Sequence, residues 1–169
     1  MPDFTDLFAQ SKGAAIEYRG KTIIRADKYP IKNGDILIAS IEKACMERRE
    51  GFAIDITGYC ELDGKIFKQG KGVMMLFWAD TAPKEIKLKI FTKREFVWVH
   101  NIWEHTNSYI TSDQEGKPIT KYSKSVESLY NGAAMIVEEI ENGRRYYCND
   151  GRPDENFDDI IFTVQKLKE

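Results

Sequence analysis

Short runs of alternating apolar and polar residues, separated by turn dipeptides, constrain the fold of this chain more than any other feature. In KEIKLKIF (84–91) the aliphatic residues point to one face of a strand, and Lys87 and Lys89 point to the other. Asp-Gly and Asn-Gly lie at the centres of LDGK (62–65) and ENGR (141–144), and both dipeptides are typical of tight hairpin turns. The pattern predicts a β protein built from hairpins.

Two of the predicted strands carry a specific expectation. FAIDITGYC (52–60) alternates over its whole length, and VMMLFW (73–78) is apolar on both faces, as a central strand would be. The polar stretch 104–132 is longer than most connections, so we expect an edge hairpin or a functional loop there. Strands are predicted at 22–26, 52–60, 73–78, 84–91, 95–103, 133–140, 144–148 and 159–164.

Helical spacing is confined to the N-terminal part of the chain. Phe4, Leu7 and Phe8 predict a short helix that packs on the core as a flap. The apolar stripe in 38–50 predicts a second helix, although its first residues, DILIAS (35–40), are equally compatible with a strand.

Together these patterns predict a mainly β fold. We expect an antiparallel β-sandwich of jelly-roll or galactose-binding-like type with one or two short helices near the N-terminus. The length fits a single domain over residues 1–169, in which residues 1–50 decorate the sandwich.

Composition narrows the class of protein. The chain is 42% hydrophobic and carries 25 basic and 27 acidic residues, which is typical of a globular protein and does not predict a nucleic-acid-binding surface. Its three cysteines argue against a disulfide framework. The N-terminus does not resemble a signal peptide, and the longest apolar run is too short to span a bilayer. We therefore expect a cytoplasmic protein that binds no membrane.

The most acidic part of the sequence is the turn before the last predicted strand. Asp150, Asp154 and Asp158 are spaced four apart there, Glu155 and Asp159 add two carboxylates, and Asn149 and Asn156 offer amide oxygens. Calcium prefers such hard oxygen ligands, and a divalent cation would remove the repulsion between clustered carboxylates. The alternative is a connector whose acidic side chains face water.

This segment, NDGRPDENFDDIIFTV, resembles the acidic loop before the last strand of bacterial calcium-dependent galactose-binding lectins, and of related calcium-binding β-domains. The resemblance implies a β-sandwich with a calcium ion bound by Asp150, the carbonyl of Asp154, and Asp158, with Asn149 beside them. The family has an asparagine where this chain has Phe157.

A bound calcium ion suggests carbohydrate as a ligand, because open coordination positions accept sugar hydroxyls and aromatic rings stack on sugars. Tyr59, Asp63 and Trp103 are the predicted ligand contacts. The favoured function is thus a non-catalytic, lectin-like calcium-binding domain. A protein–protein interaction or immunity-type accessory module without a metal is the alternative, binding through a sheet face or the 104–132 stretch.

Catalytic motifs are absent from the sequence. HNIWEH contains both histidines, His100 and His105, but five residues on a strand place them on opposite faces, so no regular element presents both to one metal. We expect His100 to be a core histidine. No phosphate loop or nucleophile elbow is present. A hydrolase with a spatially assembled site is the second alternative.

Overall fold

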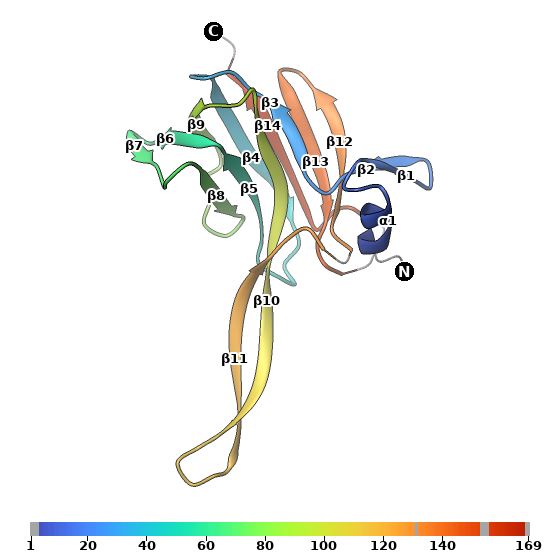
Figure 1. Cartoon of the computed structure of the whole chain (residues 1–169), viewed down its shortest axis with the longest axis vertical. Helices are drawn as coiled ribbons and strands as arrows, with labels where there is room; N and C mark the ends of the chain where they lie inside the picture. The colour runs from blue at the N-terminus through green and yellow to red at the C-terminus, as the bar shows by residue number, and fades with distance from the viewer. Residues whose placement is uncertain (1–3, 131, 153–155, 168–169) are drawn as a thin grey trace.

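The structure, a computed structural model, describes residues 4–130, 132–152 and 156–167. It is 60% strand and 4% helix, and its antiparallel strands lie mainly in two packed sheets (Figure 1). The prediction of a mainly β, antiparallel sandwich is confirmed. In chain order the elements are α1 (Phe4–Gln10), β1 (Ile16–Tyr18), β2 (Lys21–Ile23), β3 (Asp27–Pro30), β4 (Ile36–Ala44), β5 (Glu50–Ile56), β6 (Gly58–Leu62), β7 (Lys65–Phe67), β8 (Val73–Trp78), β9 (Ile86–Thr92), β10 (Phe96–Ser112), β11 (Pro118–Glu127), β12 (Ala134–Ile140), β13 (Gly143–Asn149) and β14 (Ile160–Lys166).

The two sheets differ in size. The larger has seven strands in the order β12-β13-β14-β4-β9-β6-β7. The smaller has the order β11-β10-β5-β8, and β3 also pairs with the first part of β10. β1 and β2 form a separate hairpin.

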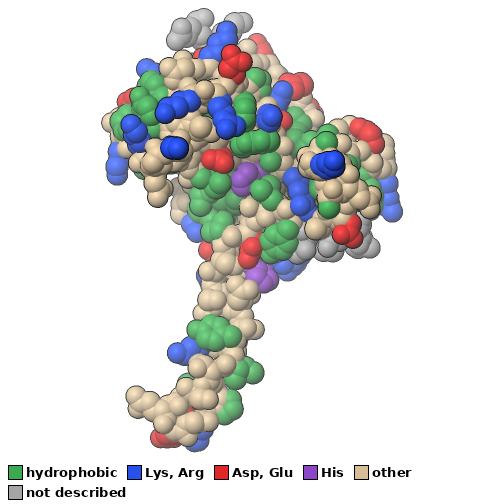
Figure 2. All heavy atoms as spheres, viewed as in Figure 1, with side chains coloured by type: hydrophobic (Ala, Val, Ile, Leu, Met, Phe, Trp, Pro, Cys, Tyr) green, Lys and Arg blue, Asp and Glu red, His purple; other side chains and the backbone are tan. Residues whose placement is uncertain are grey.

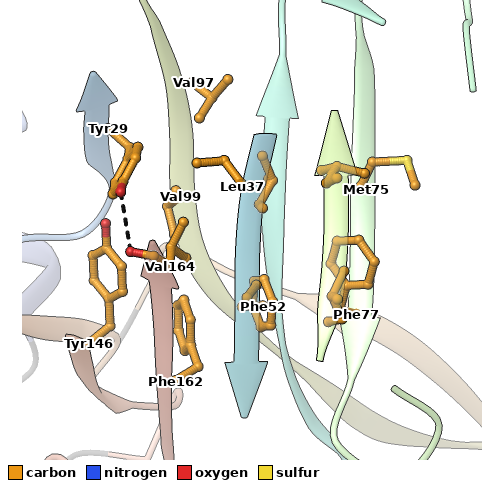
Figure 3. Close-up of a cluster of buried hydrophobic side chains, with 14 of the residues drawn as sticks. Tyr29, Leu37, Phe52, Met75, Phe77, Val97, Val99, Tyr146, Phe162 and Val164 are labelled. Atoms are coloured by element: carbon orange, nitrogen blue, oxygen red, sulfur yellow. Dashed lines mark hydrogen bonds between the residues drawn. The ribbon is translucent and has the colours of Figure 1, made fainter. Parts of the chain in front are cut away.

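The core fills the space between the sheets with apolar side chains from both (Figure 3). Phe52 of β5 and Phe162 of β14 stack across it with ring centroids 4.3 Å apart. The Tyr29 hydroxyl of β3 donates a 3.2 Å hydrogen bond to the Val164 carbonyl of β14, and this bond also joins the two sheets. Burial raises the pKa of Tyr29 to about 12, so this hydroxyl remains a donor at neutral pH.

The predicted strand 52–60 is split between the sheets. Its first part, β5, lies in the smaller sheet, and β6 lies in the larger one. The chain crosses at Gly58, whose φ is 151° and where a Cβ would lie 2.0 Å from the Phe91 carbonyl oxygen. Only glycine fits this close approach.

The predicted helix at 38–50 is wrong, because the segment forms β4 and the start of β5. β4 pairs with β14 on one side and β9 on the other, with Leu37 and Ala39 buried. The strand alternative for residues 35–40 is therefore the correct one. β4 is also an interior strand of the larger sheet, although it falls within the segment expected to decorate the sandwich.

VMMLFW forms β8, but it lies at an edge of the smaller sheet rather than at its centre. Met75 and Phe77 face the core, whereas Met74 and Leu76 are exposed. The apolar outer face of β8 is therefore uncovered in the described structure.

The N-terminal helix and the short hairpins agree with the sequence predictions. Phe4 and Phe8 of α1 are buried in a second apolar cluster with residues of β2, β12 and the acidic turn. The Asp-Gly turn joins β6 to β7, and the Asn-Gly turn joins β12 to β13. Asp63 and Asn142 have positive φ, as such turns require.

Candidate functional site

The acidic turn is held to the body by its own hydrogen bonds. Asn149 is fully buried, and its Oδ1 accepts a 2.8 Å hydrogen bond from the Phe157 N–H. Its carbonyl accepts a 2.8 Å hydrogen bond from Nδ2 of Asn101 on β10. The Asn149 amide oxygen predicted as a metal ligand thus already serves to close the turn.

Asp150 points inward. It is 2% exposed, its Oδ1 accepts the Arg152 N–H at 2.8 Å, and its own N–H donates to Oδ2 of Asp159 at 2.8 Å. Each oxygen of a carboxylate accepts more than one bond, so Asp150 retains acceptor capacity toward the interior.

The other predicted calcium ligands are placed differently. Asp158 is half-exposed and pairs with Lys43 on β4 at 3.3 Å, and it is not part of the ligand group that includes Asp150. Asp154 lies outside the described residues. Calcium binding by this turn therefore stays a prediction.

The predicted carbohydrate contacts lie in different parts of the sandwich. Tyr59 on β6 stacks on Phe91 with centroids 4.7 Å apart, and Asp63 lies in the β6–β7 turn. Trp103 belongs to β10 in the other sheet and is 1% exposed, with its ring covered by Gly151 of the acidic turn.

Asp150 is brought together with two residues that the sequence analysis did not select. Cys45 follows β4, and Glu50 begins β5. The Cys45 Sγ and one carboxylate oxygen each of Glu50 and Asp150 lie within 4.8 Å of one another. We call these three residues the acid–thiol cluster.

Glu50 is the unusual member of the acid–thiol cluster. It is 1% exposed, and its carboxylate oxygens accept no hydrogen bond from an N–H or hydroxyl group of the described residues; the group that faces them is the carboxyl of Asp150. Burial, and then the charge of Asp150, raises the pKa of Glu50 to about 10. At neutral pH Glu50 therefore carries its proton in the folded protein.

A cleft of about 980 Å³ opens beside the acid–thiol cluster. Its walls come from residues 41–50, from Ala79 and Asp80 after β8, and from 104–106 with Lys124. Cys45 and Glu50 belong to this wall, so the cluster borders the cleft.

The cysteines are not activated as nucleophiles. Burial raises the pKa of all three thiols, for Cys60 to about 11, and the nearby Glu50 adds to the effect at Cys45 and Cys148. A reactive cysteine needs the opposite shift, toward the thiolate. His100, as expected, is buried, with its Nδ1 3.1 Å from the Asn101 carbonyl oxygen.

The stretch 104–132 contains the most prominent feature of the molecule. β10 continues past the sandwich and forms a two-stranded antiparallel arm with β11, which projects away from the body (Figure 1). Nine register pairs, from Glu104↔Val126 to Ser112↔Pro118, form this arm. At about 3.3 Å per residue they extend roughly 30 Å. The predicted edge hairpin is confirmed.

The arm exposes apolar side chains to solvent (Figure 2). Paired residues of an antiparallel ladder share a face, and successive pairs alternate. The register therefore places Ile110 and Tyr122 side by side on one face, where they are 76% and 71% exposed. Tyr109 and Ile119 are neighbours on the other face.

The root of the arm is fixed to the body by charge. Arg49 contacts Asp80 at 3.0 Å and Glu104 at 3.7 Å, and Lys124 of β11 reaches Glu104 at 3.5 Å. The Glu104 N–H also donates to the Arg49 carbonyl at 3.0 Å. The arm thus leaves the body in a defined direction.

One sequence signal could have pointed to Glu50. Glu50 begins EGFAIDI, in which every residue except Asp55 is buried, and a buried acid in such a run requires a partner. The partner, Asp150, is a hundred positions away, and local spacing cannot reveal it.

Comparisons with protein-family models, with curated proteins and with solved structures gave no match. The described residues include no helix of sufficient length and apolar character to cross a bilayer. The fold and the candidate site therefore define the class, an antiparallel β-sandwich with a projecting arm, and function is inferred from the geometry alone.

Proposed function

We propose that this protein is a non-catalytic assembly module that self-associates through its β10–β11 arm. The observation that carries the proposal is the arm itself, which extends roughly 30 Å at the strand rise per residue and exposes Ile110 and Tyr122 to solvent. A lone apolar residue on a surface is ordinary, but adjacent ones on a projecting hairpin are typical of a binding surface.

The backbone of the arm supports the same proposal. A two-stranded hairpin is marginally stable in water by itself. In the described strands, the outer edge of β11 pairs with nothing, and β10 pairs only with β11 beyond Trp103. Such edges present unpaired N–H and C=O groups that another strand can pair with.

A second copy of this chain offers a matching surface. β8 is an edge strand of the smaller sheet, and it exposes Met74 and Leu76 on its outer face. An arm lying along β8 of another copy would supply main-chain bonds and cover both apolar strips. The net charge of −2 leaves little electrostatic repulsion between copies.

The test is sedimentation or light scattering of the whole chain over a wide concentration range. The wild type is expected to associate, and Ile110→Ser with Tyr122→Ser is expected to weaken association by about 10²–10³-fold, from about 3–4 kcal/mol of lost apolar burial. The control is Ser108→Thr with Thr120→Ser, which changes the same face without removing apolar surface.

The interface partner is tested by mixing. Met74→Ser with Leu76→Ser is expected to weaken association as well. In an equimolar mixture, the intact arm of the β8 variant can bind the intact β8 of the arm variant. The mixture is therefore expected to form a dimer and no larger assembly. A wild type that stays monomeric at every concentration would refute self-association.

A further inference from the structure

The acid–thiol cluster is separate from the apolar surface of the arm, and the proposed self-association does not use it. It places two carboxyl groups and a thiol, three groups with a strong capacity to bind metals, within 4.8 Å of one another. They come from the end of β4, the start of β5 and the residue after β13.

The second observation is the unsatisfied state of Glu50. Only 1% of the surface of Glu50 is accessible to solvent. Neither of its oxygens accepts a hydrogen bond from an N–H or hydroxyl group of the described residues, and the group that faces it is a second carboxyl, Asp150. A buried carboxyl group in this state costs free energy unless a proton or a cation compensates it. Both other members of the cluster also bind cations when deprotonated, so a metal ion would satisfy all three at once.

We propose that Cys45, Glu50 and Asp150 bind a divalent transition-metal ion of the zinc type, with a fourth position open to the cleft. Cysteine sulfur and carboxylate oxygen are both zinc ligands, and zinc sites are mostly tetrahedral. Calcium requires six to eight oxygen ligands, and a thiolate selects against it. Binding would displace the proton of the Cys45 thiol, because the thiolate is the ligand.

The distances are compatible with such a site. Metal–ligand bonds of about 2.0–2.3 Å place tetrahedral ligand atoms roughly 3.3–3.8 Å apart. The observed limit of 4.8 Å therefore requires a contraction of about 1 Å. Cys45 and Glu50 flank a short surface turn in which Met46 is 97% exposed, so the turn can adjust without disturbing the core.

Asp159 positions two of the three ligands. Its carbonyl accepts the Cys45 N–H at 2.8 Å, and its Oδ2 accepts the Asp150 N–H at 2.8 Å. Cys45 and Asp150 are thereby both held to Asp159, the residue immediately before β14. This arrangement gives the cluster a fixed backbone frame, as metal sites require.

The experiment uses the whole chain, freed of metal by chelation, and titrates it with Zn²⁺, Co²⁺, Ca²⁺ and Mg²⁺ separately. Zn²⁺ is expected to bind with one equivalent and to raise the melting temperature, and Co²⁺ to give a thiolate-to-metal charge-transfer absorption. Ca²⁺ and Mg²⁺ are expected to have no effect. Cys45→Ser and Glu50→Gln are each expected to weaken Zn²⁺ binding on the order of 100-fold. Asp80→Asn, a carboxylate of the same cleft, is the control and is expected to bind as the wild type.

A second readout does not depend on the variants folding. Cys45 is partly exposed, whereas Cys60 and Cys148 are buried, so a maleimide reagent is expected to modify Cys45 first in the native wild type. Zn²⁺ is expected to slow that reaction about tenfold or more. Unchanged labelling with Zn²⁺, or equal Zn²⁺ affinity in Cys45→Ser and the wild type, would overturn the site. A response to Ca²⁺ alone would overturn it too and would favour the calcium prediction for the acidic turn.

Discussion

The Tyr146 hydroxyl donates a 2.6 Å hydrogen bond to Oδ2 of Asp27, and the Arg144 guanidinium contacts the same oxygen at 2.8 Å. Tyr146 and Arg144 lie on β13 of the larger sheet, whereas Asp27 begins β3, which pairs with the smaller sheet. The contact therefore joins the two layers of the sandwich by polar groups, at the margin of an otherwise apolar core. Burial, then the charge of Asp27, raises the pKa of Tyr146 above its ordinary value, so the hydroxyl stays a donor.

Tyr146→Phe is expected to lower the free energy of unfolding by about 1–3 kcal/mol. The variant removes a hydrogen bond to a charged group while keeping the ring that stacks on Phe162. Urea denaturation measures the change. Tyr147→Phe is the control, because the neighbouring hydroxyl bonds Glu138 at the surface, and it is expected to change stability by less than about 0.5 kcal/mol. Equal effects in both variants would contradict the role given to Asp27.

Gly58→Ala is expected to destabilise the fold by about 3 kcal/mol. A Cβ at this position would meet the Phe91 carbonyl oxygen at 2.0 Å, and the backbone φ of 151° already disfavours alanine. Gly116→Ala in the turn of the arm separates the two effects, since it has φ of 80° and open space around it. That control is expected to cost about 1 kcal/mol, from conformation alone. Thermal unfolding of both variants gives the difference.

The stability of the protein is expected to fall as the pH drops below 6.5, in part because of His100. Burial lowers the pKa of His100 from 6.5, against smaller opposing effects of the Asn101 carbonyl and Asp55. Below pH 6.5 the unfolded chain therefore binds a proton that the folded chain does not, and the folded state loses up to about 1.4 kcal/mol per pH unit. Above pH 6.5 the imidazole of His100 is neutral in both the folded and the unfolded chain, so His100 does not make the unfolding free energy depend on pH there.

Replacing His100 by glutamine is the test of this assignment. The unfolding free energy of His100→Gln is expected to depend less on pH than that of the wild type between pH 6.5 and the folded-state pKa. His105→Gln, at the wall of the cleft, provides the comparison. Parallel pH curves for the wild type and His100→Gln would show that His100 is not responsible.

Shortening the arm is expected to leave the body folded. Joining His105 to Ser125, which are register partners, by Asn-Gly removes the distal pairs of the arm while keeping its root. Because the removed side chains bury little surface against the sandwich, the change in unfolding free energy is expected to stay below about 1 kcal/mol. Chemical denaturation of the shortened monomer checks this, and collapse of the body would show that the arm belongs to the folding unit.

Local patterns were sufficient for much of the fold. The alternating runs and the Asp-Gly and Asn-Gly turns predicted the strands and two of the hairpins, because these signals act between neighbours in sequence. Helical spacing was correct for α1 but wrong for residues 38–50. There, pairing of β4 with β14 and β9 decides the conformation, and both partners lie far along the chain.

The position of each strand in its sheet and the composition of the acid–thiol cluster depend on contacts between distant residues, and the spacing of residues in the sequence does not encode these contacts. β8 looked like a central strand from its apolar residues, yet it lies at an edge, where Met74 and Leu76 are uncovered. Asp150, which the acidic turn indicated, lies buried at the end of β13. Cys45 and Glu50, the other members of the acid–thiol cluster, lie about a hundred residues earlier in the chain, so only the folded chain brings them to Asp150.

β10 is one uninterrupted strand, buried in the sandwich over its first half and projecting into solvent over its second. The buried half is held in the sheet because its main chain pairs with β3 on one side and β5 on the other, whereas the projecting half has no support from the body. A sideways force applied near the turn of the arm would therefore act on the Arg49–Glu104 ion pair and on the pairing of β10 with β5. Because close-packed interiors transmit strain, bending of the arm would also strain β5, which begins at Glu50.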